Sequence, residues 1–246
     1  MKWLSIVVLT CVSLPLFAQY DGKEPDIASR HRPGIMWYFT GFKPAGKNSA
    51  PKYDRFMIDL NYNSWANDSV IYQSKPLSLG FAFHTMFDIP LAPKNTVGLG
   101  IGLSFRHQRI SFDGVLERNE QDRSTRLALT PVGMKGPEKS VFATDAFAVP
   151  VEIRFRTSQW RHVKIHAGFH VGAYTRVYTK TRLDGQDKTV KSKDFFDEDR
   201  FFYGVHARLG VRNWALFADY SLTKQFKSAQ STNLHPLSFG ITCSLF

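Results

Sequence analysis

The sequence contains eight runs in which apolar and polar residues alternate, and the connections between the runs alternate between short and long. Strict alternation with a period of two residues is typical of β-strands that have one apolar face. The runs cover residues 55–62, 77–89, 97–110, 146–156, 163–179, 201–211, 214–222 and 237–246. This arrangement constrains the fold more than any other feature, because it sets both the strands and the ends at which they are joined.

Long connections follow the first, third, fifth and seventh runs, and short connections follow the second, fourth and sixth. The long ones are 63–76, 111–145, 181–200 and 223–235, and the short ones are 90–96, 157–162 and 212–213. If each strand pairs with the next, all the short turns lie at one end. Short turns at one end and long loops at the other are typical of a barrel whose ends face two compartments.

The polar face of these runs distinguishes a membrane barrel from a soluble one. Arginine, histidine, glutamate and glycine recur on it, whereas the apolar face is almost free of charge. A soluble sandwich would bury the apolar face, but a membrane barrel turns that face to lipid and keeps polar residues inside. We therefore predict an all-β fold, an eight-stranded antiparallel up-and-down transmembrane β-barrel over residues 55–246, in the outer membrane of a Gram-negative bacterium.

The N-terminus has the pattern of a secretory signal peptide. Lys2 provides a positive charge, residues 3–16 form an apolar stretch, and Phe17-Ala18-Gln19 is a plausible cleavage site. The apolar stretch is too short to span a bilayer as a helix. We therefore assign residues 1–19 to the signal peptide.

Residues 20–54 are rich in Gly, Pro, Lys and Asp. Pro33, Pro44 and Pro51 argue against a central strand here, because proline cannot donate a ladder hydrogen bond. We predict a periplasmic N-terminal segment, in which the aromatic residues Trp37 and Phe39 are candidate contacts for a periplasmic partner.

The net charge of +11 favours anionic partners. Nucleic acid is not expected, because the cations are spread over loops and strand faces and the signal peptide directs the chain out of the cytoplasm. Outer-membrane lipid and lipopolysaccharide, whose phosphates are anionic, are the predicted partners. Removal of the signal peptide leaves Cys243 as the single cysteine, so no intramolecular disulfide or cysteine-based metal site is expected.

Charged residues on the inward face are the candidate site. We predict a charge network in the lumen formed by Arg106, Glu152, Arg154, Arg176, Arg208 and Asp219. The lumen of an eight-stranded barrel is only wide enough for side chains to fill it, which argues against a conducting pore. Charges removed from bulk water must be paired or hydrogen-bonded, so each acid should contact neighbouring arginines.

A metal site is a second interpretation of the inward histidines His166, His170 and His206. His166 and His170 are four residues apart on one strand, which separates their backbones by about 13 Å at the usual rise of a strand. That is too far for both to bind one zinc ion. We therefore expect no metal ligands and no cofactor.

The long loops contain serines and aspartates but little that could form a catalytic site. Ser111, Asp113, Ser124 and Ser140 lie in the connection 111–145, which contains no histidine to act as a base. We therefore expect no enzymatic activity. The loops 111–145 and 181–200 are instead the predicted binding surfaces.

Several short motifs resemble those of a known family. They are Arg32-Pro33-Gly34-Ile35-Met36-Trp37, Lys52-Tyr53-Asp54-Arg55-Phe56, Asp59-Leu60-Asn61-Tyr62, Met86-Phe87-Asp88-Ile89-Pro90-Leu91 and the stretch Val149–Arg156. With the overall architecture, they resemble the PorT-like outer-membrane β-barrel proteins of Bacteroidetes. The resemblance implies an eight-stranded barrel. The founding member of the family is linked to type IX secretion, so the resemblance also suggests a role in that route.

Two functional hypotheses follow. The first is a non-enzymatic outer-membrane component that is accessory to surface-protein (type IX) secretion and contacts other secretion-system proteins. The alternative is a loop-mediated binder of surface ligands, or a barrel that stabilises the envelope, with no role in secretion.

Overall fold

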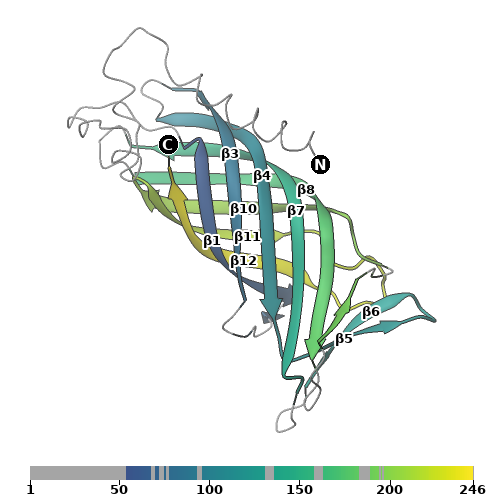
Figure 1. Ribbon diagram of the computed structural model, residues 1–246. Coiled ribbons are helices and arrows are strands. Elements are labelled where there is room, and N and C mark those ends of the chain that lie inside the picture. Colours follow the sequence, from purple (N-terminus) through teal and green to yellow (C-terminus); the bar gives the residue numbers. More distant parts are fainter. Residues whose placement is uncertain are drawn as a thin grey trace, which may run out of the picture.

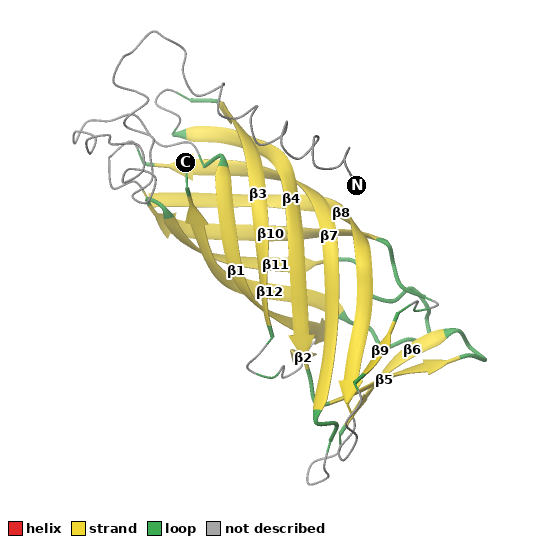
Figure 2. Ribbon diagram, in the orientation of Figure 1, coloured by secondary structure: helices red, strands yellow, loops and turns green. Residues whose placement is uncertain are grey.

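The computed structural model describes residues 54–67, 70–71, 75, 78–92, 96–130, 136–157, 163–182, 189–193, 195 and 197–245. The regular structure of these residues consists of β-strands (Figure 2). Within this part of the chain no helix has the length and apolar character needed to cross a membrane. The predicted signal peptide and the N-terminal segment, except Asp54, lie outside the described residues, as does Phe246.

Eight long strands correspond to the eight predicted runs. They are β1 (Phe56–Asn67), β3 (Leu79–Pro90), β4 (Val97–Ser111), β7 (Lys139–Arg156), β8 (Val163–Arg182), β10 (Phe201–Val211), β11 (Trp214–Ser221) and β12 (His235–Ser244). Four shorter strands lie in the long connections: β2 (Val70–Ile71), β5 (Gly114–Asn119), β6 (Ser124–Leu129) and β9 (Val190–Ser192).

The eight long strands form a closed barrel (Figure 1). Each pairs antiparallel with the next, and β1 pairs with β12 from Met57↔Ser244 to Ala66↔His235. The β8–β10 pairing completes the ring. The predicted fold class is therefore confirmed. Closure matters in lipid, because a free sheet edge would leave backbone groups without partners.

The two ends of the barrel differ as predicted. The strand ends that the short connections join lie at one end of the barrel. In the tightest connection, Arg212-Asn213, Arg212 has φ 55° and lies between the paired residues Val211 and Trp214. The β5–β6 hairpin projects from the opposite end (Figure 1). Short turns of outer-membrane barrels face the periplasm, so the predicted orientation has the β5–β6 end outside the cell.

Apolar side chains cover the outside of the barrel and polar side chains fill its lumen. Leu60 and Leu216 on the outside are each 66% exposed, whereas Glu152 and Arg154 inside are each 0% exposed. This is the reverse of a soluble protein. It is stable only where lipid surrounds the outer face.

The long connections are more ordered than the sequence indicated. The connection 111–145 was predicted as a loop, but it contains β5, β6 and the first residues of β7, and 181–200 contains β9. We call the described residues within 109–145, 174–200 and 222–235, together with Trp65, the head. The head has its own apolar core, formed by Trp65, Ile110, Phe112, Phe142, Val177, Phe195, Phe226 and Leu234.

Hydrogen bonds attach the β5–β6 hairpin to the rest of the head. The backbone amide of Thr125 donates to Ser231 Oγ at 2.8 Å, and that of Leu127 donates to Thr232 Oγ1 at 3.0 Å. Thr125 Oγ1 donates to Asp197 Oδ1 at 2.7 Å. The hairpin and the segment before β12 therefore form one unit with the residues that follow β9.

Candidate functional site

The periplasmic mouth of the lumen is closed around Asp54. Lys164 Nζ lies 2.7 Å from Asp54 Oδ1, and Arg156 Nη2 lies 3.0 Å from Asp54 Oδ2. Arg156 also donates to Asp88 at 2.6 Å, and Lys164 donates to Ser244 Oγ at 2.7 Å. These side chains come from five different strands or their ends, so the cluster holds the mouth of the barrel together.

Glu152 on β7 is the centre of the next layer. It accepts hydrogen bonds from Arg154 Nε at 2.9 Å, from His206 Nε2 at 2.9 Å and from Arg208 Nη1. Arg208 also donates to Asp59 Oδ2 at 2.9 Å. A fully buried carboxylate with three donors satisfies the requirement that buried charges be paired.

A glycine makes room for one of these arginines. Gly100 on β4 faces Arg154, and a Cβ placed at Gly100 would lie 2.5 Å from Arg154 Nε. Any larger residue would therefore displace the guanidinium from Glu152.

The charged layer nearest the head contains the ion pair between Arg106 and Asp219. Arg106 Nη2 donates to Asp219 Oδ1 at 2.5 Å, and Arg106 Nη1 donates to His170 Nε2 at 2.9 Å. Above this layer, Gln108 donates to Ser238 Oγ at 3.0 Å and Ser238 donates to Asn63 at 2.7 Å. The lumen thus changes from charged to neutral polar groups just below the apolar core of the head.

Five of the six predicted network residues lie in these layers, but Arg176 does not. Its side chain is 63% exposed and points away from the lumen, with Nη1 3.5 Å from Asp145 Oδ2. The prediction was wrong because it continued the alternation through a β-bulge. Asp145 pairs with Arg176, but the next residue, Ala146, pairs with Tyr174, so Thr175 is unpaired. An extra residue in a bulge turns the following side chains to the other face.

Other members of the network were not singled out from the sequence. Asp59, Asp88, Arg156 and Lys164 lie on the predicted polar faces, and the alternation alone was the signal that could have identified them. Asp54 had no such signal, because it precedes β1 and was assigned to the N-terminal segment. Its side chain is nevertheless buried in the mouth.

Three side chains in the lumen have the types and spacing of metal ligands. One ligand atom from each of His170, His206 and Asp219 lies within 4.8 Å of the others. This group contains Asp219 in place of His166, which instead lies 3.5 Å from Asp54 and 3.7 Å from Glu152. The guanidinium of Arg106 contacts both His170 and Asp219. Its positive charge therefore lies where a metal ion would bind these two side chains.

The lumen has little unoccupied space between these layers. The cavity lined by Asp59, His84, Arg106, His170 and Arg208 has a volume of about 10 Å³, room for about one water molecule. The described side chains therefore fill the lumen as a polar core. Together with the closed sheet and the apolar outer face, this defines an outer-membrane β-barrel with a filled lumen.

Comparison with known proteins agrees with this class. The family model described as "Outer membrane protein beta-barrel domain" matches residues 45–228, and the chain belongs to this family. The protein is therefore located in the outer membrane of a Gram-negative bacterium. A search of curated proteins found no match.

Among solved structures, the chain is similar to Ail, the attachment invasion locus protein of Yersinia pestis. The identity is 13% and the TM-score 0.34, over 76% of this chain and 93% of Ail. A second structure of Ail, in complex with the heparin analogue sucrose octasulfate, has the same identity and TM-score over 76% of this chain and 94% of Ail.

Proposed function

We propose that this protein is a non-enzymatic outer-membrane barrel whose head is a binding surface for an anionic ligand at the cell exterior. The observation that carries this proposal is the head itself. Its long connections pack around Trp65 and Phe142 instead of remaining loops. Ordering a residue costs about 1–2 kcal/mol of conformational entropy, and long ordered connections are often functional.

The filled lumen supports a surface function. A conduit would need an open path along the barrel axis, but buried ion pairs cross the described lumen at Asp54, Glu152 and Asp219. The barrel therefore acts as a membrane anchor for the head.

The face of β8 and β9 indicates the chemistry of the ligand. Lys191 Nζ lies 4.4 Å from the ring centroid of Tyr178, and Lys180 Nζ lies 5.6 Å from the same ring. Partial desolvation and the neighbouring cations Lys193 and Lys180 lower the pKa of Lys191. Cations gathered around an aromatic ring favour an anionic partner such as an acidic polysaccharide.

The test uses dextran sulfate, with neutral dextran as the uncharged probe, and purified protein in detergent micelles. We expect the wild-type protein to bind dextran sulfate, with affinity that falls as salt rises. K180Q/K191Q should bind it roughly tenfold more weakly. A matched control, R123Q/R126Q, removes the same charge at the β5–β6 hairpin. Equal binding by K180Q/K191Q and wild type would contradict the proposal.

The second candidate function is an accessory role in surface-protein secretion by the type IX route. It is supported by the resemblance to PorT-like proteins and by the position of Asp54. Lys164 and Arg156 hold Asp54, the last residue of the predicted periplasmic segment, at the end of the barrel that has the short turns. Trp37 and Phe39 would then contact other secretion-system proteins in the periplasm.

This candidate is tested in a strain that lacks the gene. If the protein acts in secretion, proteins destined for the surface should accumulate in the periplasm. Restoring the gene with Trp37 and Phe39 replaced by serine should fail to reverse this accumulation, whereas K180Q/K191Q should reverse it. An unchanged set of secreted proteins in the deletion strain would rule out the secretion role.

A further inference from the structure

The extracellular boundary of the membrane crosses β8 close to its bulge. The outward side chains of β8 are apolar from Val163 to Ala173. Those ten steps measure about 33 Å along the strand, or about 25 Å in height at a tilt of ~40°, which is the usual height of the apolar band. Thr175 and Arg176 therefore lie at the level of the lipid headgroups.

Just below this level, the outer surface has an apolar hollow of about 420 Å³. It lies over β4, β7, β8 and β10, and its lining includes Leu103, Phe147, Val149, Val171, Phe201 and Tyr203. Phe201 is 71% exposed and Tyr203 53% exposed. The size and apolar lining suit an acyl chain, which would pack against the strands at the position where they face lipid.

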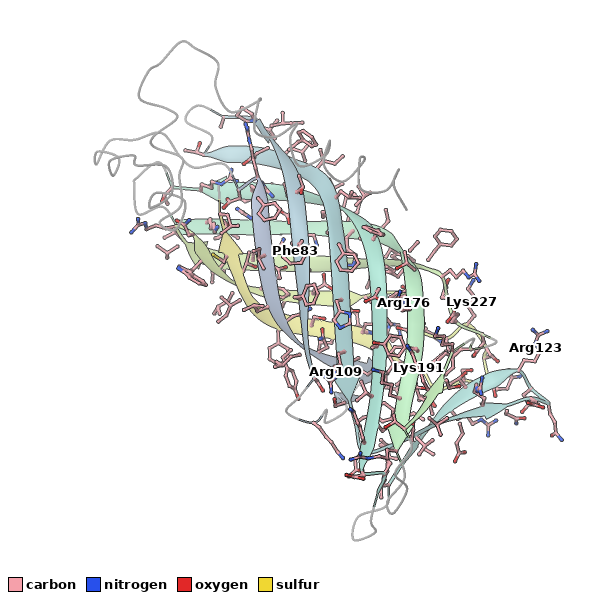
Figure 3. The ribbon with its side chains drawn as sticks, in the orientation of Figure 1. Phe83, Arg109, Arg123, Arg176, Lys191 and Lys227 are labelled. Atoms are coloured by element: carbon pink, nitrogen blue, oxygen red, sulfur yellow. The ribbon has the colours of Figure 1, made fainter. Side chains whose placement is uncertain are left out.

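At the headgroup level, a second hollow of about 380 Å³ has a mixed lining of cations, one carboxylate and the uncharged residues Tyr174, Thr175 and Val177. Arg176, Lys193 and Arg200 contribute to it, with Glu198 as the carboxylate in its lining. Arg176, Lys193 and Arg200 are exposed. Arg176 Nη1 lies 3.5 Å from Asp145 Oδ2, and the outer part of its exposed guanidinium is open to a ligand together with Lys193 and Arg200. Figure 3 labels Arg176 and Lys191 at this end of the barrel, away from Arg123 on the β5–β6 hairpin.

The two hollows meet at consecutive residues of the same strand pair. Ala173 in the apolar hollow is followed by Tyr174 in the cationic one, and Arg200 in the cationic hollow is followed by Phe201 in the apolar one. The Tyr174 amide donates to the Arg200 carbonyl at 2.8 Å, which fixes the junction. The apolar hollow is therefore directly adjacent to the cations, with the cations on the side nearer the head.

We propose that this composite surface binds a phosphorylated glycolipid of the outer leaflet, of the lipid A type. The acyl chains occupy the apolar hollow, and a phosphate contacts Arg176, Arg200 and Lys193. Guanidinium groups suit this role because their planar donors match phosphate oxygens. The head lies outside the cell, so the hollow opens to the leaflet that contains lipopolysaccharide. The site combines the lipid-facing barrel surface with Arg176, Lys193 and Arg200 of the head. It does not include Lys180 or Lys191, so it does not depend on the function proposed for that pair.

The experiment is native mass spectrometry of the full-length protein in detergent, with lipid A that carries both phosphates, with dephosphorylated lipid A, and with inorganic phosphate. We expect phosphorylated lipid A to bind and to be preferred to the dephosphorylated form. In R176Q/R200Q its affinity should fall roughly tenfold or more, since each cation at an anionic membrane surface contributes appreciably. R123Q/R126Q should bind as wild type.

A second variant tests the apolar half. Val171→Phe adds apolar bulk to the hollow without changing charge, so it should weaken lipid A binding while the barrel still folds. Equal binding of both lipid forms, or unchanged binding by R176Q/R200Q, would overturn the proposal. Inorganic phosphate that competes fully with lipid A would also overturn it, because the acyl chains would then contribute nothing. Loss of dextran sulfate binding in K180Q/K191Q with lipid binding intact would separate this site from the surface around Lys180 and Lys191.

Discussion

The barrel and the head share strands such as β7 and β8 but have opposite interiors. The barrel buries ion pairs such as Glu152–Arg154 and exposes leucine and phenylalanine, whereas the head buries Trp65 and Phe142 and exposes lysine and arginine. The difference follows from what surrounds each part, lipid in one case and water in the other. In lipid the polar side chains are buried, and in water the apolar side chains are buried.

Individual strands show this inversion along their length. On β1 the inward residues are Asp59, Asn61 and Asn63 within the barrel, and then Trp65 in the head. On this strand the alternation of inward and outward side chains continues unbroken, and the inward side chains change from polar to apolar. On β8 the bulge at Thr175 changes the phase itself, so Val177 turns inward and Arg176 outward.

The largest expected effect is in the barrel. Glu152→Ala leaves Arg154 and Arg208 buried without their shared carboxylate, and breaking a buried pair in this way costs about 3–5 kcal/mol. The free energy of unfolding, from urea titration in lipid vesicles, measures it. Glu117→Ala on the exposed β5 strand is the matched control and should change stability little. An unchanged midpoint for Glu152→Ala would mean that the lumen is hydrated and its charges are unpaired.

The corresponding change in the head is Phe142→Ala. Phe142 packs against Trp65, Phe195 and Phe226 with ring centroids 5.4–6.3 Å apart, and truncation of such a residue costs about 3–5 kcal/mol. We expect a local effect, seen as faster trypsin cleavage in the head while the transmembrane strands stay protected. Phe147→Ala, which faces lipid, is the control. If the whole barrel unfolded with the head, the two interiors would be one cooperative unit.

A smaller effect is expected from Gly100→Ala. The added Cβ would collide with Arg154 and force its guanidinium away from Glu152, and overpacking of this kind costs about 1–3 kcal/mol. The urea midpoint of the barrel should fall, and that of Ile101→Ala, on the lipid-facing side of β4, should fall less. A stability equal to wild type would show that the Arg154 side chain can move without loss.

The smallest effect is predicted for Arg176→Gln. Its ion pair with Asp145 is long and exposed, and such pairs contribute about 0–1 kcal/mol. Arg208→Gln, in the lumen, should by contrast destabilise the barrel severely. A large loss of stability in Arg176→Gln would contradict the outward position of this side chain.

The sequence was sufficient to predict the strands, their order and the polar lumen, because alternation and connection length are local properties. Glu152, Arg154 and Arg208 could be placed in the lumen for the same reason. Arg176 could not, since a bulge depends on the register of two strands and leaves no mark in the alternation of one. The head was missed because its apolar residues, such as Phe195 and Phe226, are scattered through segments without a period of two.

The position of Lys164 has a consequence for how the barrel assembles. Its ammonium group contacts Asp54, just before the first strand, and Ser244, at the end of the last strand. Asp54 and Ser244 lie side by side only when β1 is paired with β12 and the ring is closed. While the seam is open, Lys164 lacks these hydrogen-bond partners, and its charge and that of Asp54 must be hydrated. Closure of the β1–β12 seam is therefore coupled to the loss of water from the mouth around Asp54.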